Sequence, residues 1–184
     1  MRLYLVRHAR PAVADGVCYG SSDLPVPEQE QRQALAQLAA ALPKGIPLFS
    51  SPLQRCLALA AALAPALRTF APIVDPRLAE MHFGAWELRA WETVPRAEID
   101  AWAADLVHYR PGGGENVLEV AQRVQAFLDA LRRRQEDAAI VVCHAGTIRM
   151  LLACLQAASV EQAAQAAAAG AHRIAYGGLT TVDC

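Results

Sequence analysis

The sequence predicts a three-layer α/β/α fold, in which helices cover both faces of a mostly parallel central sheet. Short apolar runs alternate along the chain with longer helical patterns, which is typical of this class. Polar side chains follow directly after several of the apolar runs, at the sheet edge where such folds bind ligands. With 184 residues and no internal repeat, we expect one domain over residues 1–184.

The first expected elements are a strand, a helix and a second strand. Residues 3–6 are a short apolar run typical of a buried strand. Residues 28–42 carry leucines at helical spacing, and a proline at position 43 is a stop signal. Residues 46–49 predict the second strand.

A second helix is expected directly after this strand. Ser50 and Ser51 are candidate N-caps, and Pro52 suits the first helical turn. Residues 53–67 continue with a helical pattern, and residues 73–74 are a third, short strand candidate.

Periodicity fails between residues 75 and 95, where aromatic and charged side chains are concentrated. A long loop inside a compact domain is more often part of a site than a spacer, so we expect residues 76–115 to form an active-site loop or cap. Within this segment, residues 98–106 have a helical pattern and residues 111–114 predict a turn.

The last third of the chain returns to alternating elements. Residues 117–134 predict a long amphipathic helix, residues 139–143 a buried strand, and residues 146–155 the helix after it. Two short strand candidates, residues 173–176 and 179–182, flank a pair of glycines.

The charge balance excludes a general polyanion-binding surface. Lys and Arg total 17 against 18 Asp and Glu, giving a net charge of -1, so we expect neither nucleic-acid nor membrane binding. The first residues are too few and too soon charged for a signal peptide, and the five cysteines show no metal-finger or C-x-x-C spacing. We therefore expect a cytoplasmic protein with free, buried thiols. The oligomeric state stays open.

Five residues that suit an oxyanion are expected to converge at the carboxyl edge of the sheet. They follow four different predicted strands and are Arg7, His8, Arg55, Glu80 and His144. Each has an ordinary structural explanation when taken alone, such as a hydrogen-bonding histidine or a solvated arginine. Their joint position is harder to explain by structural needs.

The chemistry that these residues suit is phosphoryl transfer. Arg7 and Arg55 offer forked donors that match phosphate oxygens, and the helix beginning near Gly146 adds backbone donors. One neutral histidine could form a covalent phosphohistidine while the other bonds the transferring oxygens. Glu80 could protonate the leaving alkoxide and then deprotonate the water that cleaves the P–N bond.

Three segments resemble motifs of one known family. Residues 5–9 resemble the Arg-His-Gly motif of the histidine phosphatase superfamily, in its phosphoglycerate mutase-like branch. Residues 50–56 resemble its S-x-L-x-R-(A/C) motif, and residues 141–149 its late His-x-Gly motif, in order along nearly the whole chain. The resemblance implies a phosphoglycerate mutase-like fold and a phosphomonoesterase that acts on a small phosphorylated metabolite without a metal or organic cofactor.

The same resemblance implies a role for each residue at the sheet edge. His8 matches the histidine that becomes phosphorylated. Arg7, Arg55 and His144 match the residues that hold the phosphoryl group, and Glu80 matches the proton donor.

A finer resemblance concerns the substrate. Residues 18–20, 23–25, 77–87 and 111–115, with Trp102 and Asp105, are similar to the α-ribazole phosphatases of cobalamin synthesis. This implies α-ribazole 5′-phosphate or the related cobalamin phosphate as substrate. Part of that similarity is shared with other small phosphatases, so a broad-specificity small-molecule histidine phosphatase remains an alternative.

The sequence departs from the family pattern beside the nucleophile. Ala9 replaces the usual Gly after His8, which is tolerable if its φ is negative. Arg10 and Pro11 stand where an acidic or polar residue and Thr are more common, so this part of the phosphate pocket could differ.

Other classes of function remain as alternatives. A phosphoglycerate mutase-like phosphotransferase is the nearest, although the interval between Arg55 and His144 is compact, which favours transfer to water. A zinc hydrolase would use His8, His82 and His144, but these lack a short ligand pair and Arg7 would repel the cation. Nothing in the sequence supports a non-catalytic phospho-ligand module, because the nucleophile and the acid are both present.

The aromatic side chains of the loop leave two interpretations. Phe83, Trp86 and Trp91 could stack against a flat base such as a benzimidazole. Alternatively, they form a small core beneath a long loop.

Overall fold

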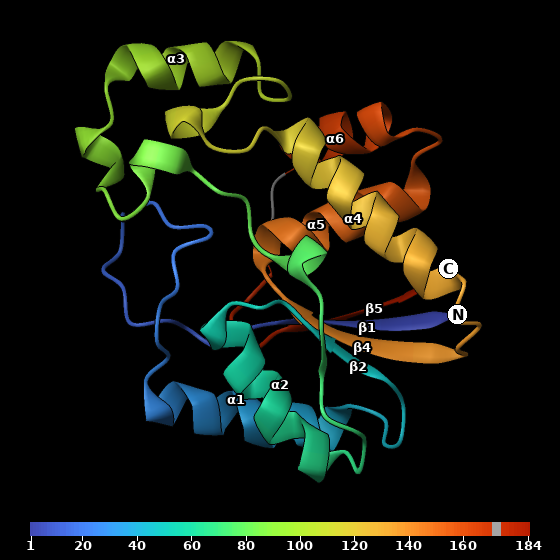
Figure 1. Cartoon of the computed structure of the whole chain (residues 1–184). Coiled ribbons are helices and arrows are strands. Elements are labelled where there is room, and N and C mark those ends of the chain that lie inside the picture. Colours follow the sequence, from blue (N-terminus) through green and yellow to red (C-terminus); the bar gives the residue numbers. More distant parts are fainter. Residues whose placement is uncertain (171–173) are drawn as a thin grey trace.

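A five-stranded sheet lies between two helical layers in the computed structural model, which describes residues 1–170 and 174–184. Figure 1 shows helices α1 and α2 on one face of the sheet and α4, α5 and α6 on the other. The strands are β1 (Arg2–Arg7), β2 (Leu48–Ser50), β3 (Ile73–Val74), β4 (Ala138–Cys143) and β5 (Leu179–Asp183). The helices are α1 (Glu28–Ala41), α2 (Gln54–Ala66), α3 (Arg96–Ala104), α4 (Val117–Arg132), α5 (Ala145–Gln156) and α6 (Val160–Ala169).

The strand order is β3-β2-β4-β1-β5, and every pairing is parallel except that of β1 with β5. The predicted three-layer α/β fold is therefore confirmed. Because β1, β2 and β4 run in the same direction, the residues that follow them emerge together at one edge of the sheet.

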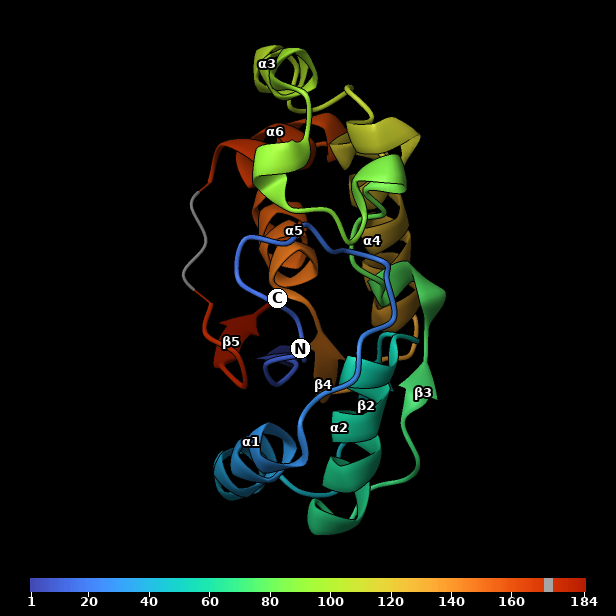
Figure 2. The same ribbon diagram turned by 90° about the vertical axis from the view of Figure 1, so that its left-hand side faces the viewer.

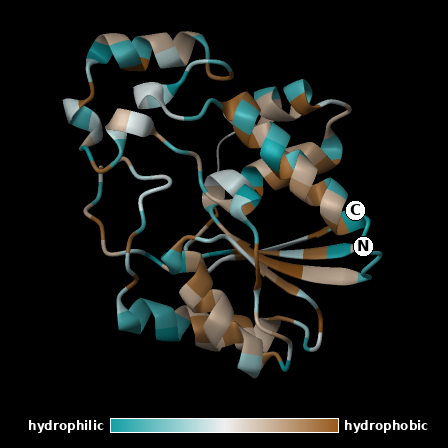
Figure 3. Ribbon diagram, in the orientation of Figure 1, coloured by the Kyte–Doolittle hydropathy of each residue, from teal (hydrophilic) through white to brown (hydrophobic). Residues whose placement is uncertain are grey.

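Two apolar cores fill the space on either side of the sheet. Side chains alternate along β1, so that Leu3 and Leu5 belong to the core under α4 and α5, whereas Val6 belongs to the core over α1 and α2. Along β4, Val141 and Val142 alternate in the same way. Strands buried on both faces read as continuous apolar runs, and Figure 3 shows this hydrophobic colour along the central strands and on α2.

Residues 75–115 leave the sheet and build a separate wall beyond its carboxyl edge. Figure 2 shows this segment and α3 above the sheet, next to the loop that follows β1. Its remaining structure consists of single 3₁₀ turns at Pro76–Leu78, Gly84–Trp86, Trp91–Thr93 and Pro111–Gly113. A small third core of Cys18, Trp86 and Val94 joins this wall to the loop after β1.

Three expectations from the sequence are wrong in detail. Helix α2 begins at Gln54, so Pro52 lies in a bend before the helix, and neither Ser50 nor Ser51 is its N-cap. Residues 174–176 lie outside any strand, and Arg173, which the same prediction included, lies outside the described residues. Of the cysteines expected to be buried, Cys184 is exposed, whereas the other four are buried as expected.

Helix α6 was not predicted from the sequence. Its stretch Ala163–Ala169 is so poor in large apolar side chains that no helical periodicity is visible. The helix is nevertheless capped by Ser159, whose side chain accepts a hydrogen bond from the Gln162 N–H, and it packs through alanines on α4 and α5.

Candidate active site

The polar residues predicted at the sheet edge do converge, around a cavity of about 560 Å³. Arg7 is the last residue of β1 and His8 follows it, Arg55 lies in the first turn of α2, and Glu80 comes from the segment after β3. These four side chains line the cavity. His144 is the N-cap of α5 and is buried behind His8, with the two imidazole centroids 5.1 Å apart.

His8 is held as a neutral imidazole whose two ring nitrogens both take part in hydrogen bonds. Its Nδ1 lies 2.7 Å from the Ala9 carbonyl oxygen, which can only accept, so Nδ1 carries the proton. The Arg55 Nε–H then donates to His8 Nε2 over 3.3 Å. Burial, followed by the Arg55 and Arg7 charges, lowers the pKa of His8 to about 3. Nε2 is therefore an unprotonated nitrogen in a cationic surrounding.

Arg55 is fully buried and is oriented by backbone carbonyls. Its Nη1 donates to the Ser22 carbonyl over 2.7 Å, and its Nη2 donates to the Gly20 carbonyl. Each terminal nitrogen carries a second N–H, which remains for a phosphate oxygen. In the part of the chain that the structure describes, the hydrogen-bond partners of Arg55 are thus all neutral.

Arg7 is placed by the turn that precedes β5. Its Nη1 donates to the Ile174 carbonyl over 2.6 Å, and its guanidinium carbon lies 3.7 Å from the centroid of the Tyr176 ring. The Arg7 Nε is buried without a hydrogen-bond partner among the described residues. The Tyr176 hydroxyl also shares a 2.6 Å hydrogen bond with that of Tyr19, which joins the C-terminal turn to the loop after β1.

His144 is a second neutral imidazole. Its Nε2 shares a 2.7 Å hydrogen bond with Ser51 Oγ, and the Cys56 Sγ lies 3.5 Å from the same nitrogen. Burial, followed by the nearby His8 and Arg55, lowers the pKa of His144 well below its usual value. Ser51, which the sequence suggested as an N-cap, thus forms a hydrogen bond with His144 and does not cap α2.

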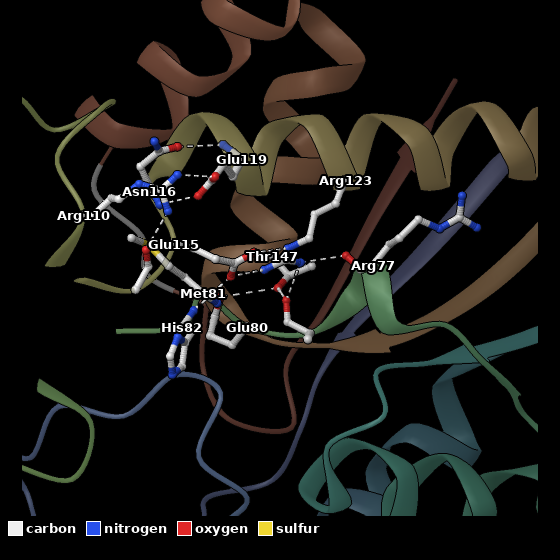
Figure 4. A network of polar contacts seen from close by, with 12 residues as sticks. Arg77, Glu80, Met81, His82, Arg110, Glu115, Asn116, Glu119, Arg123 and Thr147 are labelled. Atoms are coloured by element: carbon white, nitrogen blue, oxygen red, sulfur yellow. Dashed lines mark hydrogen bonds and ion pairs between the residues drawn. The ribbon is translucent and has the colours of Figure 1, made fainter. Parts of the chain in front are cut away.

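Glu80 lies against the N-terminus of α5. The Gly146 N–H donates to Glu80 Oε2 over 2.9 Å, and the Met81 N–H donates to Oε1 over 3.2 Å. Figure 4 shows this carboxylate beside Thr147, whose hydroxyl donates to the Ala79 carbonyl over 3.1 Å. The acid is therefore fixed between its own loop and the helix that follows His144.

An ion pair on α4 supports the segment that carries Glu80. The Arg123 Nη1 donates to the carbonyls of Arg77 and Ala79, each over 2.7 Å, and its Nε donates to Glu115 over 2.8 Å. Glu115 in turn accepts from the His82 N–H (Figure 4). Arg123 and Glu115 thus clamp the chain on both sides of Glu80, a role that sequence reasoning missed.

The outer part of the cavity is aromatic. Phe83, Trp91 and Trp102 line it, and the last two rings are stacked with an interplanar angle of 10° and centroids 6.1 Å apart. Trp86 is instead buried, with its indole N–H donating to Glu98. Trp86 thus belongs to a small core, as the second interpretation expects, whereas Phe83 and Trp91 line the cavity, and their stacking against a base stays a prediction.

Two further lining residues had been given no role from the sequence. Trp102 comes from α3, and Arg149 comes from α5, one and a half turns after His144. The Arg149 Nη1 donates to the Gly170 carbonyl over 2.7 Å, and burial lowers its pKa. The only sequence signal for Trp102 or Arg149 was that each belongs to the residues that resemble the histidine phosphatase family.

The departures beside His8 do not disturb the residues that converge at the cavity. Ala9 is buried and is not among the non-glycine residues with positive φ, so alanine meets no backbone strain there. Arg10 is exposed and pairs with Asp15 over 2.7 Å, outside the lining of the cavity.

The three histidines of the zinc alternative are not brought together. Over residues 1–170 and 174–184, no three His, Cys, Asp or Glu side chains are grouped closely enough to share a metal ion. Within the same ranges, no helix has both the length and the apolar character needed to cross a bilayer.

Comparisons with known proteins agree with this geometry. A sequence model described as "Histidine phosphatase superfamily (branch 1)" matches residues 3–178. The adenosylcobalamin/α-ribazole phosphatase of Escherichia coli K12 is 32% identical over 160 residues, covering 83% of this chain and 78% of that protein. A probable phosphoglycerate mutase GpmB of Cronobacter sakazakii is 36% identical over 138 residues, covering 71% and 62%.

A solved structure shares the whole architecture. The crystal structure of the α-ribazole phosphatase from Shigella flexneri superposes with a TM-score of 0.82 at 27% identity, covering 100% of this chain and 90% of that one.

Proposed function

Because this chain belongs to the histidine phosphatase superfamily, branch 1, and is a phosphatase, we propose that it hydrolyses phosphomonoesters through a covalent phosphohistidine on His8. The observation that supports this assignment is the state of His8: a buried, neutral imidazole whose Nδ1 proton is fixed on the Ala9 carbonyl. The unprotonated Nε2 can then attack phosphorus once the Arg55 Nε–H, which donates to it over 3.3 Å, turns to the phosphoryl group.

The reaction proceeds in two transfers. His8 Nε2 attacks phosphorus, the ester P–O bond breaks, and Glu80 gives its proton to the leaving oxygen. Water then attacks the phosphohistidine, Glu80 takes a proton from that water, and the P–N bond breaks to release phosphate and regenerate neutral His8. Arg7 and Arg55 hold the non-bridging oxygens from the cavity lining, where negative charge is carried through both steps. His144, buried directly behind His8, is proposed as the third residue that binds these oxygens.

Residues 76–115 form the cap of this site within a single domain of residues 1–184. The segment supplies Glu80 at one end and the aromatic wall of Phe83, Trp91 and Trp102 in the middle. A flat, apolar leaving group would fit between that wall and the phosphate-binding residues.

The substrate that this shape favours is α-ribazole 5′-phosphate or the related cobalamin phosphate. Its benzimidazole base would contact the stacked rings of Trp91 and Trp102. The name of the Escherichia coli relative supports the same substrate class. A phosphoglycerate mutase-like transfer is the second candidate, because the Cronobacter relative bears that name; a broad-specificity phosphatase is the third.

A substrate panel distinguishes the three. Phosphate release is measured from α-ribazole 5′-phosphate, 3-phosphoglycerate and a small aliphatic phosphate, and 3-phosphoglycerate is also tested for isomerisation. We expect kcat/KM to be highest for α-ribazole 5′-phosphate. Isomerisation without net release would assign a mutase, and similar kcat/KM values across the panel would assign a broad-specificity enzyme.

The variant Trp91→Ala tests the aromatic wall directly. We expect KM for α-ribazole 5′-phosphate to rise about tenfold, because base–aromatic stacking contributes on the order of 1–3 kcal/mol, with little change for the aliphatic phosphate. Phe70→Ala, at an aromatic ring that is 92% exposed and outside the cavity lining, is the matched control. An equal rise of KM for both substrates would contradict stacking.

A further inference from the structure

We infer that Glu87 is a positioning residue for the phosphate-binding Arg55, acting through the turn formed by residues 20–22. This inference rests on the proposed function, because it assigns Arg55 to the phosphoryl group. Glu87 does not line the cavity, and no charge of its own reaches the reacting atoms.

The Glu87 carboxylate accepts hydrogen bonds from every backbone N–H of the turn formed by residues 20–22. The backbone nitrogens of Gly20, Ser21 and Ser22 donate to it over 3.0, 2.9 and 3.2 Å. Both serine hydroxyls donate to it as well, and so does the Phe83 N–H over 3.0 Å. A single side chain thus ties the loop after β1 to the cap segment that carries Glu80.

These contacts also keep Glu87 ionised. Burial alone would raise its pKa, but the hydrogen bonds from the Phe83 N–H, from Ser22 and from the Gly20 and Ser21 N–H groups together lower the pKa below its ordinary value. The negative charge strengthens each of these hydrogen bonds.

The opposite side of the same turn holds Arg55. With their N–H groups directed to Glu87, the turn residues direct two carbonyls to the guanidinium: Ser22 O to Nη1 and Gly20 O to Nη2. The remaining nitrogen, Nε, is thereby aimed at His8 Nε2. A carboxylate outside the cavity consequently sets the angle at which Arg55 faces both the nucleophile and the phosphate.

Close packing leaves this turn little freedom to form without Glu87. A Cβ on Gly20 would lie 1.8 Å from the Met81 carbonyl oxygen and 2.7 Å from the Phe83 ring, so the glycine backbone is pressed against the cap segment. Glu87→Gln replaces one of the two carboxylate oxygens with an NH2 donor, so the backbone N–H groups that face this oxygen lose their acceptor at a place where the chain cannot simply move inward.

A double-mutant cycle tests this path. Glu87→Gln and Arg55→Lys are made singly and together, and kcat/KM is measured with an activated aryl phosphate, with inorganic vanadate as competing ligand. We expect Glu87→Gln alone to lower kcat/KM and to weaken vanadate binding at least about tenfold, but to change the Arg55→Lys background by less than about twofold. Effects that multiply independently would overturn the inference.

Two further variants keep the result interpretable. Glu98→Gln removes a carboxylate bonded to Trp86 in the same cap, away from the 20–22 turn, so it should lower stability while leaving vanadate affinity within about twofold. Ser22→Ala removes one hydroxyl donor to Glu87 and serves as the milder variant in case Glu87→Gln does not fold. We expect it to cause a smaller loss of kcat/KM and of vanadate affinity, with the same dependence on Arg55. Equal losses of vanadate affinity in Glu98→Gln and Glu87→Gln would show a merely structural role.

Failure of the proposed function gives a different result. If His8→Ala retained phosphatase activity, the phosphohistidine mechanism would be wrong whatever the cycle showed. If His8→Ala were inactive and the cycle were additive, only the role of Glu87 would be wrong.

Discussion

His8 is the residue on which the proposed mechanism depends most directly, because its Nε2 is the proposed nucleophile. We expect His8→Ala to lower kcat at least about a thousandfold, since no other group supplies the covalent route. A rapid quench of the unsubstituted enzyme should trap a phosphoenzyme that is stable to base and labile to acid. His82→Ala, at an exposed histidine, is the matched control and should keep its activity.

In the proposed mechanism, Glu80 determines how well a poor leaving group departs. Glu80→Gln cannot donate a proton, so we expect kcat for alkyl phosphates to fall far more than kcat for activated aryl phosphates, whose leaving oxygen needs little protonation. Steady-state kinetics over a series of leaving groups measures this. An equal decrease of kcat for all leaving groups would show that Glu80 is not the general acid.

The sequence located the polar groups at the strand ends but could not locate the groups that orient them. Arg7 and Arg55 follow strands directly, and the strand edge of an α/β sheet can be inferred from chain order. Glu87 and Arg123 act through turns more than thirty residues away, such as the contact of Glu87 with Gly20. Contacts of that kind depend on how two loops pack, for which the local pattern gives no signal.

At the scale of elements, α4 acts as the support of the acid loop. Arg123→Met keeps an unbranched apolar stem but removes the hydrogen bonds to the Arg77 and Ala79 carbonyls and to Glu115. We expect the kcat for alkyl phosphates to fall more than that for aryl phosphates, as with Glu80→Gln but less steeply, because Glu80 is displaced and not lost.

A cap variant on the same helix is the control for Arg123→Met. Asn116 is the N-cap of α4 and forms a capping box with Glu119 (Figure 4). Asn116→Ala should lower the free energy of unfolding by about 1 kcal/mol, measured by urea denaturation. If it also produced the leaving-group dependence, α4 stability and not the Arg123 contacts would explain the effect.

Element prediction succeeded where side-chain size carries the pattern and failed where it does not. Helix α4 was predicted almost to its ends because Val120, Val124 and Phe127 repeat on one face. Helix α6 buries alanines, whose small size leaves no contrast with the exposed alanines beside them. The single 3₁₀ turns of residues 75–95 are too short for any period to be detected.

At the scale of the molecule, the two buried histidines make folding stability depend on pH. In the folded protein the pKa of His8 is lowered to about 3 and that of His144 is lowered well below 6.5, so both stay neutral while the unfolded chain takes up protons below about pH 6.5. The contribution of the two neutral histidines to the free energy of unfolding is fully present above pH 6.5. It is lost as the pH falls from 6.5 towards their pKa values in the folded protein. Below pH 6.5, each of the two histidines should lower the free energy of unfolding by about 1.4 kcal/mol for every unit by which the pH falls.

Urea denaturation between pH 6.5 and pH 5 measures this slope while few carboxylates titrate. His8→Asn should reduce it by about half, because one of the two buried histidines with a lowered pKa, His144, would then remain. An unchanged slope in His8→Asn would mean that other groups cause the acid sensitivity.

The position of β1 also bears on when activity can first arise during synthesis. The strand that leads to His8 is translated early, yet its two neighbours are β4, beginning at Ala138, and β5, beginning at Leu179. Pairings that join such distant parts of a chain form late, because a long loop must close first. In a ribosome-bound nascent chain, His8 therefore stays exposed to solvent until the residues of β5 have emerged from the exit tunnel.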